Sequence, residues 1–328
     1  MNNLEETAAF LYQADDFLVL SHGKPDGDAA GSAFGMTTFL RDNGKNADVL
    51  FTDDIPDKFK VFVNFEYLRQ TSDWQSGKYK TLLVTDCARS SRLNSDFKLE
   101  DFNGAIINID HHVDNDVNGN LNIVIKEAGA CCSICTDLAK LMQEKYNWHI
   151  SKNTANWFYT GLVTDTGGFR FSNTNQHIFQ TAAFLLDCGA EIEAVVNAAF
   201  FSKKTNQQKF EADMVLNYVK RDFDGRYVWA YLPQDLFDRY DFDMKDGEGV
   251  IEFLRETEGS VIAVLVYPKD DTLKVSLRSK DSRYPVGPVA RSLNGGGHEM
   301  ASGITARNIS ADELCAALKN KIGELLQV

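Results

Sequence analysis

The fold is decided first by residues 16–44, which read DFLVLSHGKPDGDAAGSAFGMTTFLRDNG. The apolar run at 16–21 predicts a buried strand, and residues 29–43 predict a helix that ends at Gly44. The loop between them is short and polar and contains His22, Asp26 and Asp28. We therefore expect these three side chains at the downstream end of a strand, where a tight loop leads into a helix.

The same alternation continues through the first half of the chain. Further strands are expected at 47–51, 81–85, 105–109 and 121–125, and further helices at 131–146, 154–163 and 176–186. This pattern predicts an α/β fold with an N-terminal parallel sheet that has helices on both faces. Residues 1–190 form the first predicted domain, 191–221 a helical linker, and 222–328 a smaller C-terminal α+β domain.

Composition and charge limit the function classes. The 328 residues include 47 acidic side chains and 34 Lys or Arg side chains, which gives a formal charge of −13. Because a general binder of long nucleic acid needs a basic surface, we expect no such partner. The absence of a long apolar stretch and of a signal peptide favours a cytoplasmic protein with no membrane partner. The six cysteines are expected to be reduced thiols.

Aspartates occur in polar segments that follow four apolar, strand-like runs. The segments are SHGKPDGD at 21–28, VTD at 84–86, NIDHH at 108–112 and GLVTDTG at 161–167. Because the carboxyl ends of parallel strands share one edge of a sheet, residues far apart in sequence can converge there. Crowded carboxylates repel each other, and a bound divalent cation is the usual means of neutralising them. The pattern predicts a metalloenzyme.

Each segment alone also has an ordinary structural interpretation. An Asp-Gly-Asp turn is a common solvated loop, a His pair is common on surface loops, and Asp86 or Asp165 alone suits a helix cap. The coincidence of four segments favours the metal site. His111 and His112 cannot point the same way on an extended backbone, so we expect one to bind metal and the other to reach the substrate. Asp110 is suited to accept a hydrogen bond from an imidazole and fix its tautomer.

The order of these motifs, His-x-x-x-Asp-x-Asp, then Asp, then Asp-His-His, then Asp, resembles the DHH superfamily of phosphoesterases. The likeness extends to GGGHEMASG at 295–303 and SLRS at 276–279, which are similar to the DHH-associated substrate domain. The two-lobed arrangement looks most like the bacterial oligoribonuclease (nanoRNase) and 3′-phosphoadenosine 5′-phosphate (pAp) phosphatase branch. The resemblance makes 1–190 the metal-binding phosphoesterase domain and 222–328 the substrate-binding domain.

The resemblance also implies the metal ligands. Two divalent cations are expected, Mn²⁺ in first place with Mg²⁺ or Co²⁺ as alternatives, and Asp86 is expected to bridge them. Mixed carboxylate and imidazole ligands suit such ions. The catalytic residues would then be Asp86, Asp110 and His112, of which His112 is left for the substrate phosphate or the leaving group. The implied ligands are His22, Asp26 and Asp86 for one ion, and Asp28, Asp86, His111 and Asp165 for the other.

Substrate contacts are expected mainly in the C-terminal domain. Consecutive glycines let backbone N–H groups approach an anion, so Gly296 and Gly297 predict a concave phosphate-binding loop, with a flexible hinge as the ordinary alternative. Arg278 provides a planar fork of donors for phosphate. The remaining expected contacts are Ser279, His298 and, in the N-terminal domain, Arg170.

The expected reaction is hydrolysis of short 5′-phosphorylated oligonucleotides, with pAp as a further substrate. The expected partners are short single-stranded oligonucleotides or small phosphorylated nucleotides, and a homodimer is compatible with the sequence. Two alternatives stay open. The first is an exopolyphosphatase or a linear-dinucleotide hydrolase that uses the same metals, and the second is a nucleotide-binding regulator with weak or no catalysis.

Overall fold

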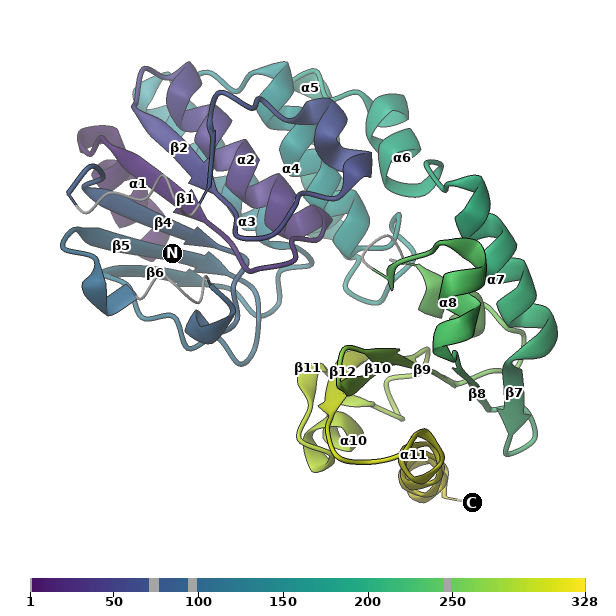
Figure 1. Cartoon of the computed structure of the whole chain (residues 1–328). Coiled ribbons are helices and arrows are strands. Elements are labelled where there is room, and N and C mark those ends of the chain that lie inside the picture. The colour runs from purple at the N-terminus through teal and green to yellow at the C-terminus, as the bar shows by residue number, and fades with distance from the viewer. Residues whose placement is uncertain (1, 71–76, 94–98, 245–248, 328) are drawn as a thin grey trace. The chain divides into compact units, whose positions relative to one another are not determined.

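The chain forms two compact units, Met1–Ser202 and Lys203–Val328, in a computed structural model that describes residues 2–70, 77–93, 99–244 and 249–327. Each unit is built on a six-stranded sheet (Figure 1). The boundary falls between two helices of the predicted linker, α6 (Ile192–Phe200) and α7 (Thr205–Asn217). The predicted domain limits at 190 and 222 stay predictions.

A parallel sheet forms the centre of the first unit. Its strand order is β3-β2-β1-β4-β5-β6, and every neighbouring pair runs parallel. From β1 the chain adds β2 and β3 on one side and β4, β5 and β6 on the other, so the direction of the strand order reverses between β1 and β4. Ligands of open parallel sheets bind outside the carboxyl ends of the strands at such a reversal. The strands are β1 (Phe17–Leu20), β2 (Ala47–Leu50), β3 (Leu68–Arg69), β4 (Thr81–Thr85), β5 (Ala105–Asp110) and β6 (Leu121–Val124).

Alternating side chains of the strands enter two separate apolar cores. Phe17 and Val19 pack on one face of the sheet, and Leu18 and Leu20 pack on the other. The first face is covered by α-helices, which are α1 (Asn2–Gln13), α2 (Gly27–Asp42), α3 (Cys131–Tyr146) and α4 (Lys152–Asp165). Beyond them, α5 (Gln176–Asp187) packs on α3 and α4, and the 3₁₀ helix η1 (Asp57–Phe62) packs on α4 and α6.

The prediction of helices on both faces of the sheet is wrong in one detail, which is the covering of the second face. In the described ranges it is covered by the 3₁₀ helices η3 (Ser90–Arg92) and η4 (Leu99–Asp101) and by connecting segments, not by α-helices. Parallel crossovers are right-handed, so connections on the two sides of the reversal pass over opposite faces. The connection from β4 to β5 contains short 3₁₀ turns in its described part, whereas the connection from β1 to β2 is the full helix α2.

Helices α2 and α4 pack closely because α2 has glycine at every fourth position. A Cβ atom added at Gly31 would stand 2.6 Å from the carbonyl oxygen of Trp157 on α4, which leaves room for hydrogen only. The first of these glycines, Gly27, faces Thr164 near the end of α4. The packing therefore brings the start of α2, with Asp26 and Asp28, to the end of α4, where Asp165 lies.

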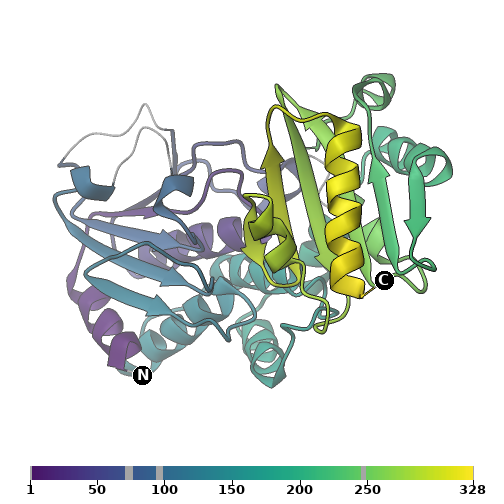
Figure 2. The same cartoon turned by 90° about the horizontal axis from the view of Figure 1, so that it is seen from below.

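The second unit contains a mixed sheet with the order β11-β12-β10-β9-β8-β7, in which β8 and β9 are parallel. Helix α11 (Ala311–Leu326) lies along one face with α10 (Gly287–Ser292), as Figure 2 shows for α11. Helices α7, α8 (Gln234–Tyr240) and α9 (Val250–Arg255) cover the other face. The strands are β7 (Val219–Asp222), β8 (Tyr227–Tyr231), β9 (Ile262–Lys269), β10 (Thr272–Ser279), β11 (Gly296–His298) and β12 (Ala301–Ala306).

The predicted fold class is confirmed: an N-terminal parallel α/β sheet precedes a smaller α+β unit. In the part of the chain that the structure describes, no helix combines the length and apolar character that a membrane crossing requires.

Candidate metal centre

The predicted ligands of the first unit gather around the reversal of strand order. His22 follows β1, Asp86 directly follows β4, and His111 follows the last residue of β5. Asp26 and Asp28 lie at the start of α2, and Asp165 is the last residue of α4. The helix expected at 154–163 is therefore confirmed, and the description of the run before Asp165 as strand-like is wrong. That run is apolar because α4 is buried, and a buried helix and a buried strand look alike in a short sequence.

His22, Asp26 and Asp86 form a first group of donor atoms. The Nε2 atom of His22 is 3.8 Å from Asp26 Oδ2 and 3.9 Å from Asp86 Oδ2. The Nδ1–H of His22 donates to the carbonyl of Gly23 at 2.8 Å, and Nε2 faces both carboxylates. Asp26 uses its other oxygen to cap α2, because Oδ1 accepts from the backbone N–H groups of Asp28 and Ala29.

His111, Asp28 and Asp165 form a second group. The Nε2 atom of His111 is 3.8 Å from Asp28 Oδ2, 3.9 Å from Asp165 Oδ2 and 3.5 Å from Asp86 Oδ1. Its Nδ1–H donates to the carbonyl of Ala128 at 3.1 Å, so this imidazole also presents Nε2 to the carboxylates. Asp86 faces both groups of donor atoms: its Oδ2 faces His22 of the first group, and its Oδ1 faces His111 of the second.

The donor atoms fit divalent cations. Most of the spacings in the two groups are too wide for hydrogen bonds. Two atoms bound to one ion at about 2.1 Å stand roughly 3 Å apart at adjacent octahedral positions and about 4.2 Å apart at opposite ones, which brackets these spacings. Among the described residues, Asp86 Oδ1 is buried with no hydrogen-bond partner, which is costly unless another group occupies that position. An oxygen and imidazole donor set with an orphaned buried carboxylate oxygen suits an ion such as Mn²⁺.

The carboxylates also perturb each other electrostatically. Burial, with the charges of Asp86 and Asp165, raises the pKa of Asp28 well above its usual range. Burial, with the charges of Asp86 and Asp26, raises the pKa of Asp165 to about 7. Burial also tends to raise the pKa of Asp86, but the imidazoles of the site hold that pKa below its ordinary value. Such crowding is the situation that a bound cation relieves.

Asp28 is held by a contact that sequence reasoning missed. Its Oδ2 accepts from the backbone N–H of Cys131 at 2.6 Å, and its Oδ1 accepts from that of Cys132 at 3.0 Å. These are the first N–H groups of α3, whose own N-cap residue, Ala130, provides no side-chain cap. Asp28 therefore caps a helix about a hundred residues away. The missing cap residue before Cys131 was the one signal for it in the sequence.

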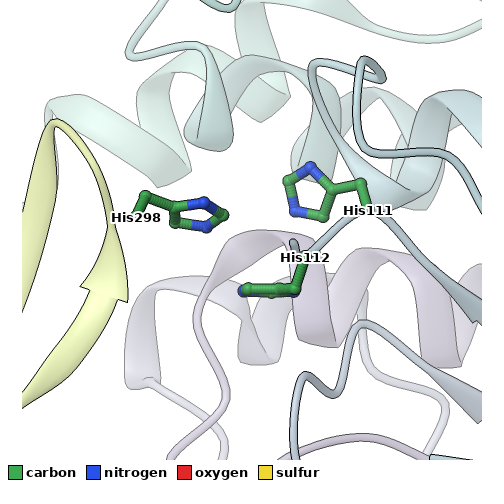
Figure 3. Close-up of side chains that lie close together, drawn as sticks. All are labelled: His111, His112 and His298. Atoms are coloured by element: carbon green, nitrogen blue, oxygen red, sulfur yellow. The ribbon is translucent and has the colours of Figure 1, made fainter. Parts of the chain in front are cut away.

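Asp110 and His112 form a pair beside the candidate metal ligands. The Nδ1–H of His112 donates to Asp110 Oδ1 at 2.7 Å, as expected for a carboxylate that fixes a tautomer. The rings of His111 and His112, both labelled in Figure 3, have centroids 4.8 Å apart and planes inclined by 72°. Asn115, which sequence reasoning did not select, donates to Asp110 Oδ2.

The predicted substrate contacts of the second unit lie on its sheet. Arg278, on β10, is half-buried, and its Nε lies 3.4 Å from Glu252 Oε1. Ser279 is fully buried, and its hydroxyl hydrogen-bonds with the backbone of Asp281 as donor and as acceptor. His298, also labelled in Figure 3, belongs to β11. In the first unit, Arg170 is exposed, and its Nε donates to the carbonyl of Gly167.

The glycine segment is a strand and not the concave loop that its composition predicted. Gly296 and Gly297 lie on β11, which pairs with β12 in a hairpin. Gly297 has φ +124°, and a Cβ atom there would stand 2.8 Å from the carbonyl oxygen of Ala301. Glycine is required here because the paired strand approaches too closely for a side chain.

Fold and donor groups together define an α/β protein with clustered candidate metal ligands at the reversal of a parallel sheet. Residues 16–162 match the DHH family N-terminal domain, and residues 224–325 match the DHHA1 domain. The bifunctional oligoribonuclease and PAP phosphatase NrnA of Thermus thermophilus is 32% identical over 90% of this chain and 85% of its own length. The chain therefore belongs to the DHH family, as the order of its motifs predicted.

A further relative and a solved structure are similar over nearly the whole chain. The protein of the same name from Bacillus subtilis is 25% identical over 93% of this chain and 94% of its own length. The crystal structure of an exopolyphosphatase-related protein from Bacteroides fragilis superposes with a TM-score of 0.89 at 23% identity and covers 99% of this chain and 98% of that one. At that identity the superposition establishes the shared fold.

Proposed function

We propose that this protein is a metal-dependent phosphoesterase that hydrolyses short 5′-phosphorylated oligonucleotides and, as a further substrate, pAp. The observation that carries the proposal is the position of Asp86, whose two oxygens face two separate groups of metal-ligand atoms at the reversal of the sheet. The names of the relatives from Thermus and Bacillus support the choice of substrates. This proposal also keeps the predicted cytoplasmic location and leaves room for a homodimer.

Two divalent cations, Mn²⁺ in first place, belong to the proposal. One would be held by His22, Asp26 and Asp86, and the other by Asp28, Asp86, His111 and Asp165. When bound, such a pair supplies an activated water at neutral pH and stabilises charge on a phosphoryl oxygen. The chain contributes the orientation of the donors: hydrogen bonds to Gly23 and Ala128 aim both imidazoles through Nε2.

His112 is proposed to meet the substrate. Asp110 accepts its Nδ1–H, so a proton carried by Nε2 is the one that the ring would donate to a phosphate oxygen or a leaving oxygen. In the second unit, Arg278 offers planar donors for a terminal phosphate, with Gly296, Gly297 and His298 as further contacts. Arg170 and Ser279 complete the proposed set, although the burial of Ser279 favours a supporting role for its hydroxyl.

Short substrates agree with the charge of the chain. At a formal charge of −13, the surface as a whole repels a long polyanion. A dinucleotide or pAp needs only local positive charge, which cations and a few Arg side chains provide. We therefore expect activity to decline as the oligonucleotide lengthens.

The test is a product-resolved substrate panel. Purified protein with Mn²⁺ is incubated with 5′-phosphorylated RNA from dimer to pentamer, a long RNA, pAp, pyrophosphate and polyphosphate, and Asp86→Asn protein serves as the control. We expect mononucleotides from the short RNAs and phosphate from pAp. Turnover confined to pyrophosphate or polyphosphate would refute the proposal, and tight nucleotide binding without turnover would favour the regulator.

A further inference from the structure

We propose that Asn115 is a positioning residue that holds His112 in one tautomer and ties the ends of β4 and β5 together. The inference rests on the proposed function, because it assigns a purpose to His112 as a substrate contact. Asn115 lies in the loop that follows β5, five residues after Asp110.

The amide of Asn115 is fixed at both of its polar atoms. Its Nδ2 donates to Asp110 Oδ2 and, at 3.0 Å, to the backbone carbonyl of Cys87. Its Oδ1 accepts at 3.0 Å from Asn108 Nδ2, which is itself anchored on the carbonyl of Val117 at 2.9 Å. Turning the amide over would place its oxygen against two acceptors and its NH₂ against a donor. One orientation therefore satisfies the site.

The first consequence concerns the carboxylate of Asp110. This side chain is fully buried, and its Oδ1 accepts from the backbone N–H of His111 at 2.7 Å and from the Nδ1–H of His112. The amide of Asn115 donates to the other oxygen, so both oxygens of the Asp110 carboxylate accept hydrogen bonds. Held in this way, Asp110 keeps a lone pair on the Nδ1–H of His112 and so fixes which ring nitrogen carries that proton.

The second consequence concerns Asp86. Cys87, whose carbonyl accepts from Asn115, directly follows Asp86, which has φ +51° at the end of β4. The backbone N–H of Asp86 donates to the carbonyl of Ile109 on β5 at 3.0 Å. Asn115 therefore adds a second link between the ends of β4 and β5. Asp86 follows β4 and reaches both donor groups, and His111 and His112 follow β5. A side chain in the loop after β5 thus links the shared ligand to the histidine pair.

The experiment follows the imidazole of His112 by NMR. Full-length protein with ¹⁵N-labelled histidine and diamagnetic Mg²⁺ is compared with Asn115→Leu, which keeps the volume without the amide, and with Asn115→Ala. The signals of His112 are assigned by their loss in His112→Asn. The matched control is Asn43→Ala, which also loses three hydrogen bonds, to Phe39 and His149. Asn43 lies at the far end of α2, about 24 Å along the helix from the ligands.

We expect the ring ¹⁵N shifts of His112 to move towards the other tautomer in both Asn115 variants and to stay in place in Asn43→Ala. In the same variants, kcat on a 5′-phosphorylated RNA dimer at saturating metal should fall by about 10- to 100-fold, with KM unchanged. Unchanged His112 shifts would overturn the proposal. So would loss of folding by both Asn115 variants, because Asn115 would then serve stability alone. If the wild-type protein cleaves no oligonucleotide, the proposed function fails, and the His112 shifts still decide the role of Asn115.

Discussion

Gly161 on α4 offers a sharp test of the second donor group. A Cβ atom at this position would stand 2.5 Å from Asp28 Oδ1 and would also collide with the sulfur of Cys132. An ordinary contact needs 3.4 Å, so in Gly161→Ala the carboxylate of Asp28 must move by about 0.9 Å or α3 must retreat. The same carboxylate is held by the start of α3, so it cannot move without loss of those hydrogen bonds.

The expected magnitudes separate stability from metal binding. Alanine in place of a helical glycine contributes about 1 kcal/mol in favour of the helix, and overpacking costs about 1–3 kcal/mol. The free energy of unfolding should therefore fall by roughly 0–2 kcal/mol. Displacement of a metal ligand is a larger functional change. We expect a loss of about 10- to 100-fold in affinity for one cation, which corresponds to about 1.4–2.8 kcal/mol.

The assay is calorimetric titration of the metal-free protein with Mn²⁺, together with urea unfolding. The matched control is Gly35→Ala, in which the added methyl meets the ring of Phe158 in the same contact between α2 and α4 and touches no proposed ligand. We expect both variants to lose stability and only Gly161→Ala to lose affinity in one of two binding steps. Two unaltered binding steps in Gly161→Ala would refute the placement of Asp28 among the metal ligands.

Three further predictions concern other parts of the chain. Asp86→Ala should abolish turnover and weaken both metal-binding steps, and calorimetry that shows one intact step would contradict the bridging role. Arg278→Ala should raise KM for an RNA dimer with little change in kcat, whereas Arg283→Ala, which removes an exposed side chain paired with Asp281, should leave both constants unchanged in steady-state kinetics. Asp48 is buried and paired with three cations; burial raises its pKa, but the hydroxyl of Tyr79 and these cations hold that pKa below 3.8. The ionised Asp48 therefore stabilises the folded state fully above pH of about 4, and this stabilisation is lost as the pH falls through the lowered pKa. Asp48→Asn should lower the free energy of unfolding by about 3–5 kcal/mol at pH 7. Urea unfolding from pH 3 to 7 should show a weaker pH dependence of stability in this variant than in the wild type.

The sequence by itself determined the fold class, the family and the residues that converge. Periodicity identified the strands of the first sheet, since alternate apolar side chains such as Phe17 and Leu18 must be buried on opposite faces. The rule that parallel strands end at one edge then placed His22, Asp86 and the Asp-His-His motif together. These inferences depend on local pattern and on topology, and both are encoded in short stretches of the chain.

Tertiary structure alone decided how the ligands are held. Asp165 joins the group because glycines let α4 press against α2, and Asp28 is anchored by the start of α3, more than a hundred residues away. Asn115 looks like an ordinary loop residue until its amide is seen between Asp110 and Cys87. Likewise, the glycine segment became a strand because β12 pairs with it. Each of these features depends on distances between groups remote in sequence, and those distances are set by packing, which no local pattern specifies.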